Sequence, residues 1–184
     1  MMKQFNSQKR EQGVVLFMSL VMLMILTILG LSSIQTTSLQ EVMSRNAQDT
    51  NLAFQSAESA LRDGEDLLEN YQSLALFDAG ATGHYYENDP DETPNWREVD
   101  WDATTEAAGG YLFRDTPITG VAEQPRFIVE HVKTVISDSD VLNQDNIGQD
   151  TGSGRTQIFR VTTYGVGGSS TARVMLQATY GKRF

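Results

Sequence analysis

Cysteine is absent from the 184 residues of this chain, and histidine occurs only twice. Without disulfides, stability must come from packing alone. Neither His84 nor His131 has a Cys, His or carboxylate partner at a spacing that suits a transition metal. The sequence also lacks a cysteine nucleophile and a G-x-S-x-G motif, so it shows no recognisable catalytic constellation. We therefore predict no enzyme activity, no cofactor and no metal site.

Positive charge is scarce, because 14 Lys and Arg residues stand against 24 Asp and Glu residues, a net charge of −10. Residues 1–13 contain three cations and one carboxylate, so everything after Gly13 carries −12. Nucleic-acid binding depends on clustered Lys and Arg, and this acidic chain has no basic stripe. We predict no nucleic-acid partner.

An uncharged stretch follows Gly13 and continues from Val14 to Gln40. Its first eighteen residues form a helix that rises about 27 Å, close to the ~30 Å hydrocarbon core of a bilayer. Three cations precede this run, and the first cation after it is Arg45, so the positive-inside rule predicts a helix with its N-terminus in the cytoplasm. The residues predicted to lie in the membrane are Val14, Leu16, Phe17, Met18, Leu20, Val21, Leu23, Ile25, Leu26, Ile28 and Leu29.

Three processing schemes are open for the apolar run. The segment Leu29–Ser33 weakly resembles the small-residue cleavage site of a secretory signal, and an uncleaved signal anchor would keep the whole run in lipid. A cut before the run, after Gly13, would leave Val14 as a new N-terminus with the apolar helix still attached. We expect the cut after Gly13 and keep the uncleaved anchor as the alternative.

The helical pattern continues beyond the membrane segment, from Leu39 to about Tyr71, with apolar residues on one face and charged residues on the other. We predict that this face packs on the chain's own sheet. A separate coiled-coil partner is the less favoured alternative, because the small residues Ala47, Ala53, Ala57 and Ala60 suit close packing against a sheet. One helix over both halves would be about 85 Å long, more than a membrane anchor needs. The residues predicted to contact the sheet recur every seven positions: Ala47, Phe54, Leu61 and Leu68.

Three C-terminal segments have the composition of strands: Arg126–Ile136, Thr156–Val166 and Thr171–Gly181. The glycine-rich segment Gly165–Ser170 predicts a hairpin turn between the last two. It is not a phosphate-binding loop, because no Lys-Ser/Thr follows and no helix opens there. The predicted fold class is α+β, with a long N-terminal helix packed on a small antiparallel β-sheet.

All four prolines fall in residues 72–125, an acidic segment without a sustained period, which predicts a loop region with short elements. Its aromatic residues are expected to anchor it to the domain, and a partner-binding surface is the alternative. The acidic residues of this segment are expected to be solvated, with weak calcium binding as the alternative. The aromatic residues are Tyr85, Tyr86, Trp96, Trp101, Tyr111 and Phe113, and the acidic residues are Glu87, Asp89, Asp91 and Glu92.

Oxygen-bearing side chains also alternate in residues 137–155, which suggests a calcium loop. Counted from Asp138, the positions that an EF-hand reserves for glycine and glutamate hold Asn143 and Gln149, so the motif fails. We expect a flexible polar loop there, with calcium binding as the alternative.

The stretch from Gln12 to Glu65 resembles the N-terminal region of PilX-type minor pilins of the type IV pilus system. The segments TTSLQEVMSRN and LAFQSAESALRDGE are the most similar, and FRVTTYGVGGSSTARVMLQATY resembles the end of such chains. The resemblance implies a type IV pilin-like fold and cleavage by a prepilin peptidase between Gly13 and Val14. It also implies that the predicted membrane residues later form part of a filament core.

One departure from the family pattern concerns the fifth residue of the mature chain, where major pilins carry a glutamate and this chain carries Met18. In the family that glutamate neutralises the N-terminal ammonium of a neighbouring subunit, and a buried charge without a partner is costly. We therefore expect a position at or near the pilus tip. The missing glutamate is less consistent with a role as a repeating subunit of the pilus shaft.

The resemblance implies a minor pilin of the priming or tip complex that supports adhesion and twitching motility. Its implied partners are the prepilin peptidase, other minor pilins, the major pilin and a PilY-type tip adhesin. It would lie in the inner membrane, with a periplasmic C-terminal domain, before entering the pilus. A minor pseudopilin of a type II secretion system and a membrane-anchored periplasmic protein that does not polymerise are the alternatives.

The expected organisation has five parts. They are a leader (1–13), a transmembrane or filament-core half-helix (14–35), an amphipathic half-helix (36–71), a variable acidic loop region (72–125) and the C-terminal sheet (126–184).

Overall fold

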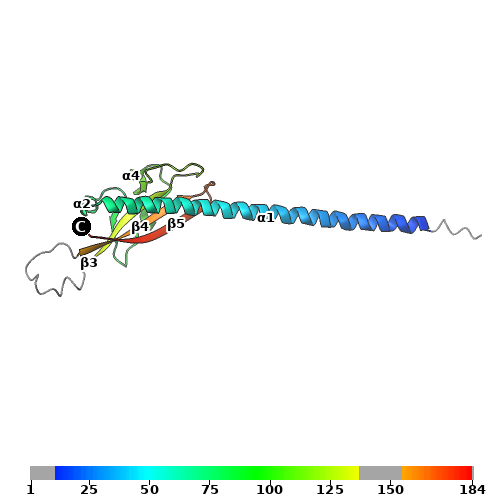
Figure 1. The fold of residues 1–184 in the computed structure, drawn as a ribbon, viewed down its shortest axis with the longest axis horizontal. Coiled ribbons are helices and arrows are strands. Elements are labelled where there is room, and N and C mark those ends of the chain that lie inside the picture. The colour runs from blue at the N-terminus through cyan, green and yellow to red at the C-terminus, as the bar shows by residue number, and fades with distance from the viewer. Residues whose placement is uncertain (1–10, 137–154, 184) are drawn as a thin grey trace, which may run out of the picture. The chain divides into compact units, whose positions relative to one another are not determined.

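The computed structural model describes residues 11–136 and 155–183 (Figure 1). The chain divides into two units, residues 1–46 and 47–184, and α1 contributes to both. The elements in chain order are α1 (Glu11–Asn70), α2 (Ala75–Asp78), β1 (His84–Tyr86), α3 (Asn95–Glu98), α4 (Glu106–Gly109), β2 (Leu112–Phe113), β3 (Arg126–Ile136), β4 (Arg155–Val166) and β5 (Arg173–Arg183).

The first unit consists, within its described residues, of the N-terminal part of α1. From Val14 to Gln40 this part carries no charge, and some of its hydroxyls bond back to the helix: Thr27 donates to the carbonyl of Leu23 (2.7 Å) and Thr36 to that of Ser32 (3.0 Å). These bonds give each hydroxyl a hydrogen-bond acceptor within the helix, so that it does not need water. This part of α1 is therefore suited to a surrounding that offers no hydrogen-bond partners.

The second unit contains a mixed sheet of five strands in the order β1-β3-β4-β5, with β2 also paired to β3. β3, β4 and β5 are antiparallel neighbours, which confirms the three predicted strands, although β5 runs from Arg173 to Arg183, two residues later than expected. The sheet is mixed because β1 pairs parallel to β3. β1 and β2 contain three and two residues, too short for any alternation in the sequence to reveal them.

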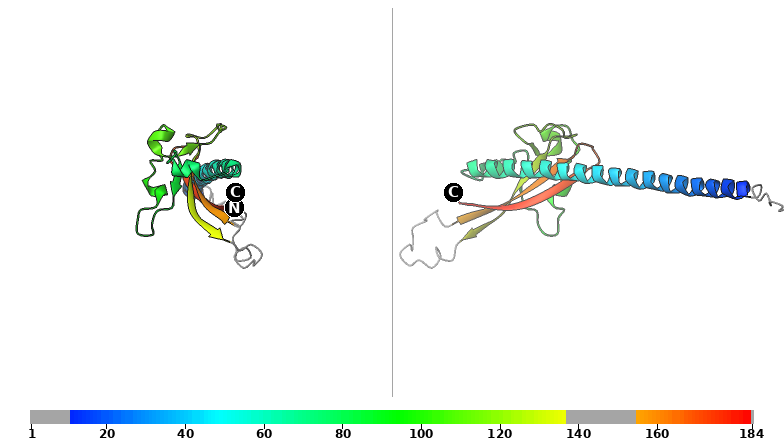
Figure 2. Two further views of the ribbon diagram at one scale, coloured as in Figure 1. Left: turned by 90° about the vertical axis from the view of Figure 1, so that its left-hand side faces the viewer. Right: turned by 45° about the vertical axis from the view of Figure 1, so that its right-hand side comes forward.

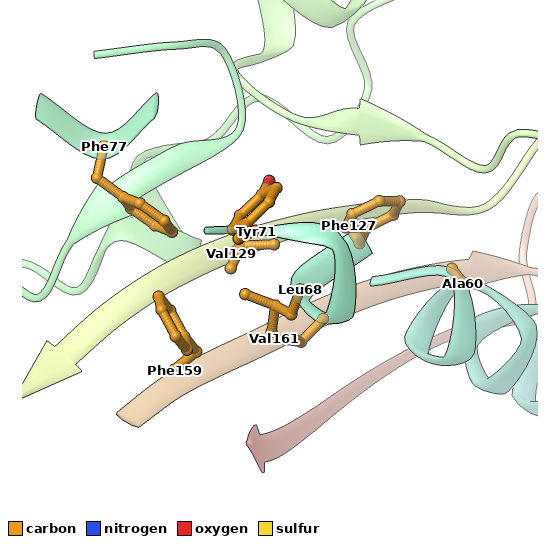
Figure 3. Packing of buried hydrophobic residues seen from close by; sticks show 8 residues of the cluster. All are labelled: Ala60, Leu68, Tyr71, Phe77, Phe127, Val129, Phe159 and Val161. Atoms are coloured by element: carbon orange, nitrogen blue, oxygen red, sulfur yellow. The ribbon is translucent and has the colours of Figure 1, made fainter. Parts of the chain in front are cut away.

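The C-terminal part of α1 lies across one face of this sheet (Figures 1 and 2). Its contact residues Ala53, Ala57 and Ala60 are fully buried. The α+β arrangement predicted from the sequence is thus confirmed. The cluster of buried side chains between helix and sheet (Figure 3) contains Ala60, Leu68, Tyr71, Phe77, Phe127, Val129, Phe159 and Val161.

The buried face of α1 differs from the predicted seven-residue stripe. Leu68 is fully buried and Leu61 is half-buried, but Phe54 is 45% exposed and Ala47 is exposed. The reason is helical geometry, because a seven-residue spacing drifts by about 20° per repeat on an α-helix. The face that contacts the sheet instead follows spacings of three and four residues, through the small residues Ala53, Ala57, Ala60 and Gly64 to Leu68.

The helix and β4 approach closely because Gly165 lies at the contact. A Cβ at Gly165 would lie 2.8 Å from the Cα of Ala57 and would also collide with the backbone at Ala53. A Cβ at Gly64 would lie 2.7 Å from Cγ1 of Val161. The helix thus rests on the strand with little side chain between the two backbones.

The opposite face of the sheet is covered by the acidic middle segment. Tyr111 is fully buried there with Ile128, and partly buried aromatic residues pack around them. Trp101 stacks on Tyr164 of β4, with ring centroids 5.4 Å apart. These contacts confirm that aromatic residues of this segment anchor it to the domain, whereas Tyr86 stays 43% exposed.

We predict that Gly165→Ala destabilises the protein by about 1–3 kcal/mol, because the new methyl group overpacks the helix–strand contact. Gly181→Ala is the matched control in the neighbouring strand, where a Cβ would make ordinary contacts of 3.5 Å with Ile158 and Thr156. Thermal unfolding of both full-length variants in detergent measures the difference. Equal melting temperatures would show that the close approach at Gly165 is not required.

Candidate functional site

The N-terminal half of α1 is apolar on all sides. Apart from Val21, which is half-buried, the predicted membrane residues are exposed in the isolated chain, from 52% at Ile25 to 72% at Leu16. The helix is long and apolar enough to cross a membrane, with a mean hydropathy of 2.8 in its most apolar window. A helix that is apolar all round needs lipid or other helices to cover it. This surface is therefore the main candidate for function.

The predicted cleavage position lies in the first turn of α1, which begins at Glu11. The first turn of a helix has N–H groups without intrahelical partners, so a cut there removes few backbone bonds. Among the described residues, and apart from its chain neighbours and the nearby helix backbone, no heavy atom lies within 4 Å of the position that a Cβ on Gly13 would take. Packing within the chain thus gives no reason for a glycine at this position. Met18, one turn further on, is 64% exposed.

Asp49 connects α1 to the turn between β4 and β5, within the second unit. Its Oδ1 accepts hydrogen bonds from the backbone N–H of Gly168 (2.6 Å) and of Ser169 (3.1 Å). The Ser169 hydroxyl donates to the other carboxylate oxygen. These bonds, led by the one from the Ser169 hydroxyl, lower the pKa of Asp49 below its usual value. Sequence reasoning missed this contact, because nothing local relates two residues 120 positions apart.

A second connection joins β5 to the C-terminal end of α1. Lys182 donates to the carbonyl oxygens of Leu68 (2.9 Å) and Glu69, and the Tyr180 hydroxyl donates to the Glu69 carboxylate (3.3 Å). The last turn of α1 contains no basic residue of its own. Lys182 therefore supplies the cation that the negative end of the helix dipole favours. With the Asp49 contact, α1 is bonded to β5 and to the turn that precedes it.

An ionic cluster lies on the opposite face of the sheet. Glu130 of β3 is 1% exposed and accepts hydrogen bonds from Nε of Arg160 (2.9 Å) and from the Asn95 side chain (2.9 Å). Arg160 also bonds to Glu87 (2.7 Å), so these groups attach residues 87–95 to the sheet. Burial works against the charge on Arg160, but Glu130 and Glu87 outweigh it and raise its pKa.

The sequence contained a signal for this cluster. Glu130 and Arg160 are charged residues of opposite sign inside two strands, and they occupy directly opposite register positions. Of the predicted acidic run, Glu87 is ion-paired with Arg160, whereas Asp89, Asp91 and Glu92 are exposed.

Both histidines have structural partners. His84 accepts a hydrogen bond from the Tyr71 hydroxyl and donates through Nδ1 to the carbonyl of Thr82 (2.8 Å), and burial raises the pKa of Tyr71 to about 12. His131 bonds to Gln157 (2.9 Å). Within residues 11–136 and 155–183, no three His, Asp or Glu residues are placed to hold a metal ion. The calcium hypothesis for residues 137–154 lies outside the described residues.

Two family matches together span nearly all of the described chain. The PilX N-terminal family matches residues 12–62, which lie in α1. The type IV pilus assembly protein PilX C-terminal family matches residues 69–182, from the end of α1 through the sheet. The chain belongs to the PilX family of type IV pilus assembly proteins. No curated protein and no solved structure matched the chain.

The PilX matches confirm the resemblance noted in the sequence. They make this chain part of the type IV pilus assembly machinery, a structural role in which pilins are its partners. Asp49 lies in the region matched by the PilX N-terminal family, and Ser169 lies in the region matched by the PilX C-terminal family, so their contact connects the two regions. The contact therefore couples the helix of the first family segment to the sheet of the second.

We predict that Asp49→Asn reduces the loss of stability in acid. The pKa of Asp49 is lower in the folded state than its ordinary 3.8, so its contribution is present above pH 3.8 and is lost as the pH falls through the folded value. Unfolding of the full chain, followed from pH 7 to pH 2, measures this dependence. Asp66→Asn, on the exposed side of the same helix, is the control. Identical pH profiles for Asp49→Asn and the unmodified chain would contradict the prediction.

We predict that Arg160→Met costs about 3–5 kcal/mol, because it leaves the Glu130 carboxylate buried without a countercharge. The double variant Glu130→Met/Arg160→Met should recover much of that loss, since both charges are then absent. A double-mutant cycle measured by denaturant unfolding tests this. Additive losses would show that the pair is not coupled.

Proposed function

We propose that this PilX-family chain is a minor pilin, cleaved after Gly13 and then inserted into the pilus through the N-terminal half of α1. The observation that carries the proposal is the exposed apolar surface of that half, which begins directly at Val14 and continues around the helix. The chain's own sheet covers one face of α1 from Ala53 to Leu68. Within the described residues, the apolar N-terminal half has no such cover.

The proposed mechanism exchanges one apolar surrounding for another. In the inner membrane, lipid covers the apolar half-helix, and three cations in residues 1–13 keep the leader in the cytoplasm. After cleavage, residues 14–35 leave lipid and pack against equivalent helices of other subunits. Lipid tails are as apolar as these side chains, so close packing between helices is what favours the filament. The second unit would remain periplasmic and then lie on the pilus surface.

The place that we propose is the priming or tip complex. The family pattern puts a glutamate at the fifth mature position, where it pairs with the N-terminal ammonium of a neighbouring subunit. This chain has Met18 there, and no charged residue occurs between Val14 and Gln40. A subunit without that carboxylate cannot pair with the N-terminal ammonium of a neighbouring subunit. It therefore suits a place in the pilus where no such pairing is needed. Adhesion and twitching motility would then depend on this chain through the pili that it helps to start.

The other minor pilins, the major pilin and a PilY-type adhesin are the partners that this place implies. A minor pseudopilin would share the leader, the helix and the sheet, but both family matches belong to PilX, and the C-terminal one names type IV pilus assembly. The genes next to this one would distinguish the two systems.

We predict that Gly13→Val blocks processing, whereas Gly30→Val does not. The two glycines lie in the same helix. Among the described residues, no side chain and no distant backbone lies within 4 Å of the place where a Cβ would be added at either, so the space for a valine is the same at both. Co-expression with a prepilin peptidase, followed by N-terminal sequencing, should find Val14 first in the unmodified chain and in Gly30→Val. Gly13→Val should retain its leader, insert in the membrane and be absent from pili.

Two results would contradict the proposal. One is a mature chain that keeps its leader or begins after Ser33, which would favour an uncleaved anchor or an ordinary signal sequence. The other is normal incorporation of Gly13→Val into pili. A label on the chain, seen at pilus ends or along the shaft, decides the proposed position.

A further inference from the structure

The outer edge of β5 is long and open. β5 ends the sheet, and its eleven residues pair with β4 without any register shift. Within residues 11–136 and 155–183, no strand pairs with its other edge. An open edge presents a row of backbone donors and acceptors to any strand that can approach.

The register identifies which backbone groups are free. The N–H of Gly167 donates to the carbonyl of Ala172 (2.9 Å), so these opposite residues form a hydrogen-bonded pair. Hydrogen-bonded and non-hydrogen-bonded pairs alternate along an antiparallel ladder. Val174 and every second residue after it therefore bond to β4. The N–H and C=O groups that point to the open edge belong to Met175, Gln177, Thr179 and Gly181.

This edge lacks the features with which sheets usually prevent pairing. The segment from Val174 to Gly181 contains no charge and no proline, and its pairing with β4 contains no bulge. The bulge in this sheet lies instead in β3, between His131 and Lys133. β3 also has β1 and β2 on its outer edge, which cover part of it. Among the described residues, β5 is therefore the long edge without a strand partner, whereas the other end of the sheet is the three-residue β1.

The flank of α1 beside this edge carries apolar side chains as well. Tyr180 bonds to Glu69, so this side of the helix faces β5. Leu61 is half-buried there, and Phe54, seven residues earlier on the same side, is 45% exposed. An added strand would cover these side chains with every second residue, while its backbone bonded to β5.

We propose that β5 receives an extended strand from another pilus subunit, which continues the sheet next to α1. The strand would be uncharged over about eight residues, to match Val174–Gly181, and would carry a carboxylate near Arg183. A second copy of this chain fits less well, because full-length antiparallel pairing of two β5 strands places Arg173 of one copy opposite Arg183 of the other. The inference rests on membership of the pilus machinery and holds for a tip or a shaft position.

The test uses the full chain in cells that contain the complete pilus system. A photo-reactive p-benzoyl-phenylalanine replaces Met175, whose side chain lies beside the open edge and is 37% exposed. Thr179→Pro removes an outward N–H without removing a bond to β4, whereas the control Thr179→Ala keeps that N–H. We expect a cross-link to a different pilus subunit, reduced at least tenfold by Thr179→Pro and unchanged by Thr179→Ala.

Amide hydrogen exchange gives a readout that does not depend on how well the proline variant folds. In the isolated chain, the amides of Met175, Gln177, Thr179 and Gly181 should exchange rapidly, and in the co-purified complex at least tenfold more slowly. Any one of four results would overturn the inference. They are a cross-link to a second copy of this chain, no cross-link, a cross-link that survives Thr179→Pro in a folded chain, and unchanged amide exchange in the complex. A chain that begins at Val14 and enters pili without a strand partner would contradict only this inference, whereas an unprocessed chain would contradict the proposed function.

Discussion

The second half of α1 can lie close to the sheet because small residues line both surfaces where they meet. Ala53, Ala57 and Gly165 bring the backbones of helix and strand together, and larger side chains pack beyond this point around Leu68. Hydrogen bonds accepted by Asp49 and donated by Lys182 then hold the two ends of the contact. The sheet thus covers one face of this half of the helix, whereas Phe54 on its flank stays 45% exposed. The N-terminal half has no such cover within the described residues.

The two halves of α1 therefore have different requirements although they form one continuous helix. Alanine and glycine at spacings of three and four residues suit the sheet, whereas an apolar surface on all sides suits lipid or a bundle of similar helices. The change between the two patterns needs no break in the backbone. In the mechanism that we propose, the folded unit would stay intact while the apolar half exchanges lipid for other helices.

The acidic middle segment is a second structural layer, attached to the sheet by aromatic stacking and by the Glu130–Arg160 pair. Tyr111, Trp101 and Ile128 supply the apolar part of this attachment, and Asn95 and Glu87 complete the polar part. Because one sheet face is used by α1 and the other by this layer, the outer edge of β5 is the long edge that the described residues leave for backbone pairing. In the assembly that we propose, the sheet would connect the internal packing of the subunit to its contacts with neighbours.

Local patterns were enough to predict the long helix, its apolar half, the three C-terminal strands and the family, because these depend on composition, on periodicity over ten or more residues and on recognisable motifs. They also suggested a contact stripe on α1, but a seven-residue repeat is a poor guide on a straight helix, and Phe54 lies outside the contact. The parallel pairing of β1, the Asp49–Ser169 bonds and the free edge of β5 became visible in the folded chain alone. Whether residues far apart in the chain pair, or a strand edge stays unpaired, depends on the packing of the whole unit. No local sequence pattern encodes that packing.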